Sequence, residues 1–174
     1  MAASNYHKLP ILFAFLVALI TRNVNADLID TVCAKTQHPP ICQKALRSDP
    51  RSKNADLKGL GFISIDITTD KAKSGKTLVQ SLMGKSTDPK EKSALSSCLE
   101  NYGDSIDTLG ECPDLLKSGD YNGVNVKASS ALDDIGTCDD GFEDLGKPEP
   151  AQLKDASFNA QAVCEIILVI SNLL

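Results

Sequence analysis

The chain of 174 residues carries 23 acidic and 18 basic side chains, a formal charge of −5, 5% aromatic residues and no tryptophan. Nucleic-acid phosphates need a basic face, so this acidic balance excludes nucleic acid as an expected partner. The length suffices for one domain with a buried core, and the scarcity of aromatic residues favours packed helices over a β-sandwich.

Residues 1–26 have the features of a secretory signal peptide. A short polar start precedes an apolar run over residues 9–20, which is too short to span a bilayer as a helix. Val24 and Ala26 place small residues at the −3 and −1 positions of a cleavage site, so we expect the mature chain to begin near Asp27. A membrane anchor is the alternative. Loss of the segment leaves a formal charge of −7, and we expect no later apolar stretch to hold the mature chain in a membrane.

Residues 27–50 predict a small N-terminal helical hairpin. Its turn is His38-Pro39-Pro40, because consecutive prolines cannot continue a helix. Cys33 and Cys42 flank this turn, so we predict that a disulfide between them staples the hairpin.

Residues 51–174 show heptad-like apolar spacing in four segments, and such a stripe faces a partner helix at each turn. The first segment, from residue 55 to about 82, is the loosest, and the second is built on Leu95, Leu99, Tyr102, Ile106 and Leu109. In the third (124–145) and fourth (153–174), apolar residues alternate in steps of three and four.

Helix-stop and helix-start signals separate these segments. Asp88-Pro89-Lys90-Glu91 has the pattern of a capping box, and Ser118-Gly119-Asp120 ends one helix and caps the next. Two prolines within residues 146–150 end the third helix. Such short connections make consecutive helices antiparallel. We therefore predict an all-α fold, an up-down-up-down four-helix bundle preceded by a disulfide-stapled helical hairpin.

The six cysteines lie in an exported chain, where disulfides are favoured, and their spacing contains no CxxC pair that would indicate zinc. In an antiparallel hairpin, residues equidistant from the turn lie at the same height. Cys98 and Cys138 average to position 118, at the turn between the second and third helices, so we predict that they are bonded.

Cys112 and Cys164 do not meet by the same rule. They are about 12 Å apart in height, on helices that are diagonal in the bundle, so we predict two free thiols. The alternative is a bridge between them after a local rearrangement. Pro113 could cause one, because we expect it to interrupt the second helix beside Cys112.

The mature chain contains no recognisable catalytic centre. His38 is its single histidine, and no nucleophile elbow, phosphate loop or metal-ligand cluster is present in the sequence. We therefore expect no enzyme activity, no cofactor and no metal ion.

Seven carboxylates and one threonine instead form two rows on helix surfaces, at Glu100, Asp104, Asp107 and Glu111, and at Asp133, Thr137, Asp140 and Asp144. Each row points away from the apolar stripe of its own helix, so its members face solvent and lack the pocket that a catalytic pair needs. Two interpretations stay open for these rows. They are either a solvated face or a rigid polar recognition surface on two helices tied by the Cys98–Cys138 bridge.

Several stretches of the mature chain carry a resemblance to a known family. They are Ser48-Asp49-Pro50-Arg51-Ser52, Asp56-Leu57-Lys58-Gly59-Leu60-Gly61, Glu100-Asn101-Tyr102, Ser118-Gly119-Asp120-Tyr121-Asn122 and Leu168-Val169-Ile170-Ser171-Asn172-Leu173-Leu174. Together with the frame of Cys33, Cys42, Cys98 and Cys138, they resemble the plant invertase and pectin methylesterase inhibitor family. The resemblance covers essentially all of residues 27–174, which we therefore interpret as one inhibitor domain.

The resemblance implies a function. It implies a protein secreted into the plant cell wall that caps the pectin-binding cleft of a pectin methylesterase in a 1:1 complex and so regulates pectin demethylation. It also implies that Cys164 is unpaired and that the partner-binding residues are Glu100, Asp104, Asp107, Thr137 and Asp140.

The family has a second branch, which inhibits acid invertases through a Pro-Lys-Phe motif after the Gly-Asp that opens the third helix. Here Gly119-Asp120 is followed by Tyr121-Asn122-Gly123, which favours pectin methylesterase over acid invertase as the partner. A secreted carrier of lipids or other small ligands is a third possibility, although the eight-cysteine frame of small plant lipid carriers is absent.

Overall fold

The computed structural model describes residues 27–174, and the predicted signal segment 1–26 lies outside the described residues. All regular elements in the described part are helices, which confirms the predicted class. In chain order they are α2 (Leu28–Cys33), α3 (Pro39–Ser48), the 3-10 helix η2 (Pro50–Asn54), α4 (Leu57–Lys85), α5 (Pro89–Ser118), α6 (Tyr121–Asp144) and α7 (Ala151–Leu173).

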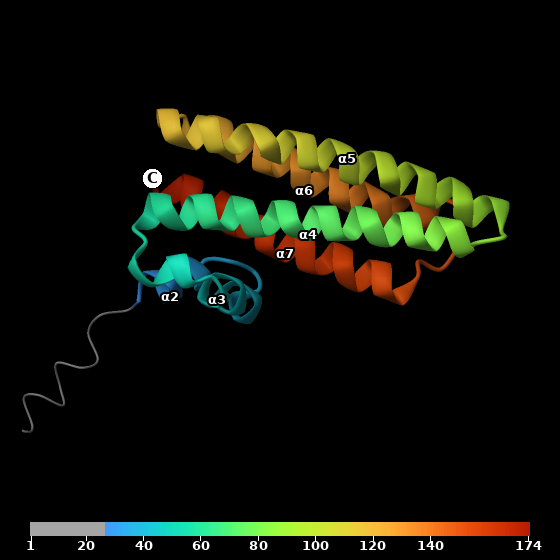
Figure 1. The fold of residues 1–174 in the computed structure, drawn as a ribbon, viewed down its shortest axis with the longest axis horizontal. Coiled ribbons are helices and arrows are strands. Elements are labelled where there is room, and N and C mark those ends of the chain that lie inside the picture. The colour runs from blue at the N-terminus through green and yellow to red at the C-terminus, as the bar shows by residue number, and fades with distance from the viewer. Residues whose placement is uncertain (1–26) are drawn as a thin grey trace, which may run out of the picture.

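The four long helices, α4 to α7, form a bundle (Figure 1). α4 packs on α5 and α7, and α6 packs on the same two helices, so α5 and α7 are diagonal to each other. The connections over residues 86–88, 119–120 and 145–150 are short, and consecutive helices run antiparallel. The predicted up-down-up-down topology is confirmed.

Aspartate side chains cap the N-termini of three of the long helices. Each accepts a hydrogen bond from a backbone N–H in the first turn, at 2.7 to 2.9 Å, for Asp56 with Gly59, Asp88 with Lys90 and Asp120 with Gly123. Such caps satisfy donors that a helix leaves unpaired, and each contributes about 1 kcal/mol. The capping box predicted at Asp88 is only half formed, because Glu91 accepts from the Ser86 hydroxyl instead of the Asp88 backbone.

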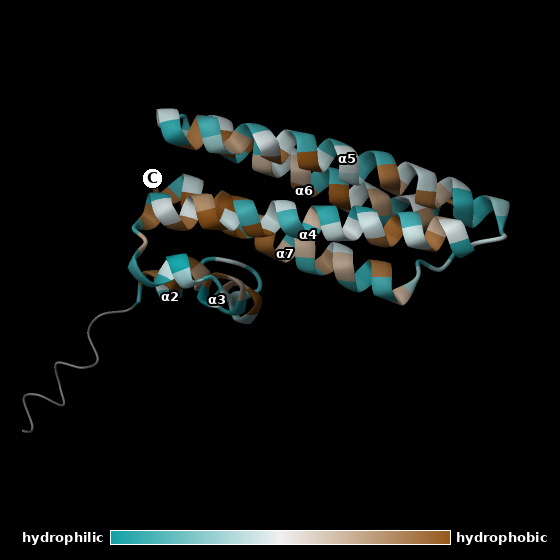
Figure 2. Cartoon of the chain, in the orientation of Figure 1, coloured by the Kyte–Doolittle hydropathy of each residue, from teal (hydrophilic) through white to brown (hydrophobic). Residues whose placement is uncertain are grey.

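The bundle core is filled by large apolar side chains from all four long helices. In Figure 2, hydrophobic and hydrophilic residues alternate along each of these helices, as amphipathic packing requires. The largest fully buried side chains of the bundle are Leu60, Ile65, Leu95, Tyr102, Leu109, Leu116, Ile135, Phe142, Leu153, Ile166 and Ile167. Burial of each such aliphatic or phenyl group stabilises the fold by about 1.5–3 kcal/mol.

α7 differs from the sequence expectation in one respect. It is long and apolar enough to cross a membrane by length and composition, and in residues 27–174 no other helix is. Its apolar character is explained by packing, because Leu153, Ile166, Ile167 and Ile170 are at most 1% exposed. α7 also contacts the N-terminal hairpin, so it is buried on two sides.

The prediction that Pro113 interrupts the second helix is wrong. α5 continues through Pro113 to Ser118 and ends at Gly119, whose φ of 84° closes the helix in the left-handed conformation. A proline inside a helix removes one backbone hydrogen bond and costs about 3 kcal/mol. Buried Leu109, Cys112 and Leu116, on both sides of Pro113, offset this cost by holding the last turns of α5 against the bundle.

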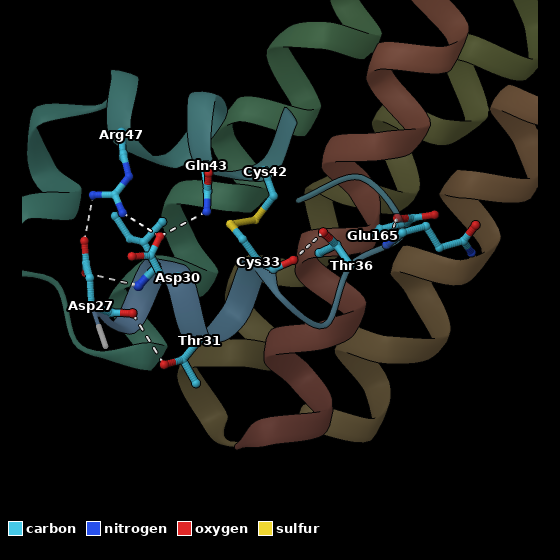
Figure 3. Close-up of a disulfide and its surroundings, with 11 residues drawn as sticks. Asp27, Asp30, Thr31, Cys33, Thr36, Cys42, Gln43, Arg47 and Glu165 are labelled. Carbon is cyan, nitrogen blue, oxygen red and sulfur yellow. Dashed lines mark hydrogen bonds and ion pairs between the residues drawn. A yellow bond between two sulfur atoms is a disulfide. The ribbon is translucent and has the colours of Figure 1, made fainter. Parts of the chain in front are cut away.

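The hairpin of α2 and α3 packs on α4 and α7, on the side of the bundle away from α5 and α6 (Figure 1). A disulfide joins Cys33 and Cys42, with their Cα atoms 5.4 Å apart. Arg47 holds the open end of the hairpin by donating to Asp27 and to Asp30, each at 2.7 Å (Figure 3). The hairpin therefore leaves the outer faces of α5 and α6 free for other contacts.

Cys112 and Cys164 carry free thiols in the core. They belong to the diagonal helices α5 and α7 and contact carbonyl oxygens, Cys112 that of Thr108 at 3.9 Å and Cys164 that of Ala128 at 3.3 Å. Burial raises the pKa of Cys112 to about 11 and that of Cys164 to about 12. Both are therefore protonated and weakly nucleophilic at neutral pH.

Candidate partner-binding face

α5 carries the first row of carboxylates predicted to bind a partner. Glu100, Asp104 and Asp107 are all exposed, and their spacing of four and three residues places them along one side of the helix. Tyr102 and Leu109 are buried on the other side. The packing of α5 against its neighbours therefore turns the three carboxylates outward.

α6 carries the second row. Thr137 and Asp140 are exposed, whereas Ile135 and Phe142 of the same helix lie in the core. The Thr137 hydroxyl donates to the carbonyl oxygen of Asp133 at 2.9 Å, one turn earlier. Because this bond uses the hydroxyl proton, the exposed Thr137 oxygen can only accept from another molecule.

A disulfide and a surface ion pair join the helices that carry the two rows. Cys98 and Cys138 form a disulfide with their Cα atoms only 4.4 Å apart, which brings α5 and α6 into close contact. Farther along, Lys127 of α6 pairs with Glu111 of α5 at 2.8 Å. The rows lie on adjacent helices that are joined at two heights, and together we call Glu100, Asp104, Asp107, Thr137 and Asp140 the acidic face.

Asp134 lies where α5 and α6 meet and is not among the residues predicted from the sequence. Burial raises the pKa of this half-buried carboxyl, and the charges of Asp104 on α5 and Asp133 on α6 raise it further. The carboxylate of Asp104 on α5 therefore repels that of Asp134 on α6 across the contact between the two helices. The same-height rule could have found Asp134, because positions 134 and 104 average to the turn at 119.

The charges of the acidic face are not neutralised within the described part of the chain. None of its five residues takes part in an ion pair there, whereas Glu111, one turn beyond Asp107, is paired with Lys127. An ionised carboxylate accepts several hydrogen bonds, and it is acceptor-only. The face is therefore suited to bind donors and positive charge on another molecule.

The histidine and the possible metal ligands of residues 27–174 lie apart from any recognisable reactive cluster. His38 packs edge-on against Phe158, with ring centroids 4.8 Å apart, and so lies on the hairpin side of the bundle. Within the described range, no group of three or more His, Cys, Asp or Glu side chains is placed to hold a metal ion. The acidic face itself offers carboxylates and one hydroxyl, whose oxygens accept hydrogen bonds.

Known proteins are similar to this chain in sequence and in fold. A family model described as "Plant invertase/pectin methylesterase inhibitor" matches residues 27–170. The chain is 46% identical to a pectinesterase inhibitor from Actinidia deliciosa, over 99% of this chain and 95% of that protein. It is 36% identical to a putative invertase inhibitor from Platanus acerifolia, over 79% and 80% of the two chains. The crystal structure of a mutant form of an Arabidopsis pectin methylesterase inhibitor matches with a TM-score of 0.76 and 34% identity, over 86% of this chain and 98% of that one.

Proposed function

The chain belongs to the plant invertase/pectin methylesterase inhibitor family, and on this premise we propose that it inhibits a plant pectin methylesterase. The observation that carries the proposal is the 46% identity, over nearly the full length, to a relative named for inhibition of pectinesterase. The proposed role is binding, without catalysis by the chain itself. By slowing the esterase, the protein would regulate pectin demethylation.

The acidic face is our proposed contact surface, in a 1:1 complex. A cleft that holds polyanionic pectin presents donors and positive charge to its ligand, and exposed carboxylates on α5 and α6 are complementary to such groups. The Cys98–Cys138 disulfide already fixes these helices together. Little conformational entropy would therefore be lost on docking.

Acid invertase is the second candidate target, because relatives at 35–36% identity are named putative invertase inhibitors. The first turn of α6 favours the esterase. Asp120 accepts from the N–H of Gly123 at 2.9 Å, and a Cβ atom at position 123 would lie 2.5 Å from Asp120 Oδ2. The phenylalanine that the invertase-type motif has there would require the Asp120 carboxylate to shift from this position.

We further propose that the mature chain is secreted into the plant cell wall and begins near Asp27. Two disulfides are consistent with an oxidising route of export. N-terminal sequencing of the protein recovered from the medium of expressing plant cells tests this proposal. A first residue within two positions of Asp27 supports it, and a protein retained in the cell with Met1 contradicts it.

Paired inhibition assays test the target. Purified residues 27–174 are titrated into a plant pectin methylesterase, with methanol release as the readout, and into a cell-wall invertase, with sucrose hydrolysis as the readout. We expect the rate of demethylation to reach its minimum at about one inhibitor per enzyme, and the rate of sucrose hydrolysis to remain unchanged. Inhibition of the invertase without any effect on the esterase would overturn the assignment.

A further inference from the structure

A polar layer crosses the bundle near the connection between α6 and α7. The hydroxyl groups of Tyr102 on α5 and Ser157 on α7 are 3.0 Å apart and fully buried. Beside this pair, Gln161 of α7 donates to Asp139 Oδ2 of α6 at 3.1 Å. The Asp139 carboxyl is thus held by a side chain of the neighbouring helix α7.

One oxygen of this carboxyl has no donor. Asp139 Oδ1 is buried without a hydrogen-bond partner among residues 27–174, and the same is true of Glu149 Oε1 in the connection between the helices. The two carboxyl groups line one hollow of about 300 Å³ and lie within hydrogen-bond reach of each other. Two ionised carboxylates cannot satisfy one another, because each only accepts. A proton on one of them supplies the missing donor.

We propose that Asp139 and Glu149 share one proton, and that this proton is a pH-sensitive latch holding residues 145–150 against α6. The latch is closed when Glu149 is protonated and donates to the Asp139 carboxylate. When Glu149 ionises, two negative charges face each other in a half-buried site, and the connection is released at that point.

The surrounding charges act on the latch from each neighbouring element. Partial burial is the main cause that raises the pKa of Glu149, followed by the charge of Asp139 and their hydrogen bond, and the value reaches about 7. Burial likewise raises the pKa of Asp139, with Asp140 adding to it. The other charged or titratable groups near the pair are Glu143 on α6, Lys147 in the connection, Lys154 on α7 and Tyr102 on α5, of which Lys154 lowers the pKa of Glu149.

The direction of the pH effect follows from linkage. The ordinary pKa of Glu149 is 4.5, and the folded chain raises it to about 7, so the folded state binds this proton more tightly than the unfolded state does. The stabilisation is complete below pH 4.5 and is lost as the pH rises through about 7. When the latch opens, Lys147 stays paired with Asp88 at the start of α5, and the backbone N–H groups of Gly146 and Lys147 stay bonded to α6 carbonyl oxygens.

The latch bears on the proposed inhibition because Asp139 is next to Asp140 of the acidic face. An open latch loosens the last turns of α6 and with them the position of Asp140. The latch itself is a property of the inhibitor alone.

The experiment uses residues 27–174 without an esterase. Carbon-13 NMR of the side-chain carboxyls gives the titration midpoint of Glu149, which we expect near pH 7 instead of 4.5. Thermal unfolding midpoints at pH 5 and pH 8 are compared for wild type, Glu149→Gln and the control Glu143→Gln. The amide introduced by Glu149→Gln donates to Asp139 without titrating, so the difference between the two pH values should shrink by at least half. Glu143→Gln should retain the full difference.

A Glu149 midpoint below pH 5, or a full wild-type pH dependence in Glu149→Gln, would overturn the latch. The NMR titration of the wild type decides the matter even if the variant fails to fold. Inhibition of the esterase at pH 5 and pH 8 is measured last. If the latch titrates as expected and no inhibition appears at either pH, the proposed function fails and the latch stands.

Discussion

Asp139 and Asp140 are adjacent in the sequence, and the bundle gives them opposite environments. Asp139 points toward α7, where it is half-buried and accepts a hydrogen bond from Gln161. Asp140 is exposed on the outer side of α6 and forms no ion pair within residues 27–174. One step of about 100° around the helix therefore separates a carboxyl that structures the molecule from one that is free to bind another.

The contrast between inward and outward carboxyl groups applies to the whole bundle, where the inward groups affect folding and the outward groups are available for binding. The inward carboxyls are pH-sensitive because burial and a like charge penalise their ionised forms. The outward carboxylates contribute little to folding because water screens them. Substitutions on the inward side should consequently change stability, and substitutions on the outward side should change inhibition alone.

The greatest loss of stability is expected at Cys138, in the same turn as both aspartates. Replacing Cys98 and Cys138 with serine opens a loop of 40 residues, and the chain-entropy model predicts a loss of about 4 kcal/mol in the free energy of unfolding. The matched control replaces Cys33 and Cys42, whose loop spans 9 residues, with an expected loss of about 2.5 kcal/mol. Urea unfolding without reductant measures both. An equal or larger loss in the hairpin variant would contradict the central role given to the α5–α6 bridge.

A smaller effect is expected where α4 supports the inward side. A Cβ atom on Gly75 would lie 2.3 Å from Cε1 of Tyr102, whose ring is buried and whose hydroxyl is held by Ser157. Gly75→Ala should therefore destabilise the bundle by about 1–3 kcal/mol. Gly84→Ala, in the same helix with nothing within 4 Å of the new methyl group, should be neutral or stabilising by up to about 1 kcal/mol. Thermal unfolding measures the stability of both variants. Equal losses of stability would contradict the importance of the Tyr102 contact and would leave helix propensity as the explanation.

The helices, their order and the outward direction of the carboxylate rows could be predicted from the sequence, because apolar period and short turns determine them locally. Pro113 shows where local rules fail. Its helix-breaking tendency is overridden by the burial of Leu109, Cys112 and Leu116 around it. The pairing of Asp139 with Glu149 could not be predicted either, because it depends on how the irregular connection 145–150 folds back on α6. The position of Asp134 beside Asp104 could have been predicted by applying the same-height rule to carboxylates as well as to cysteines.

The most direct test of the acidic face compares two double variants with the same change in charge. Asp104→Ala with Asp107→Ala removes two carboxylates from the face, and Asp70→Ala with Asp155→Ala removes two exposed carboxylates from α4 and α7. Titration of a plant pectin methylesterase gives the inhibition constant of each. We expect the first variant to be weakened at least tenfold, or about 1.4 kcal/mol, with an unchanged unfolding midpoint, and the second to match wild type. Identical inhibition curves for both variants and wild type would show that the contact surface lies elsewhere.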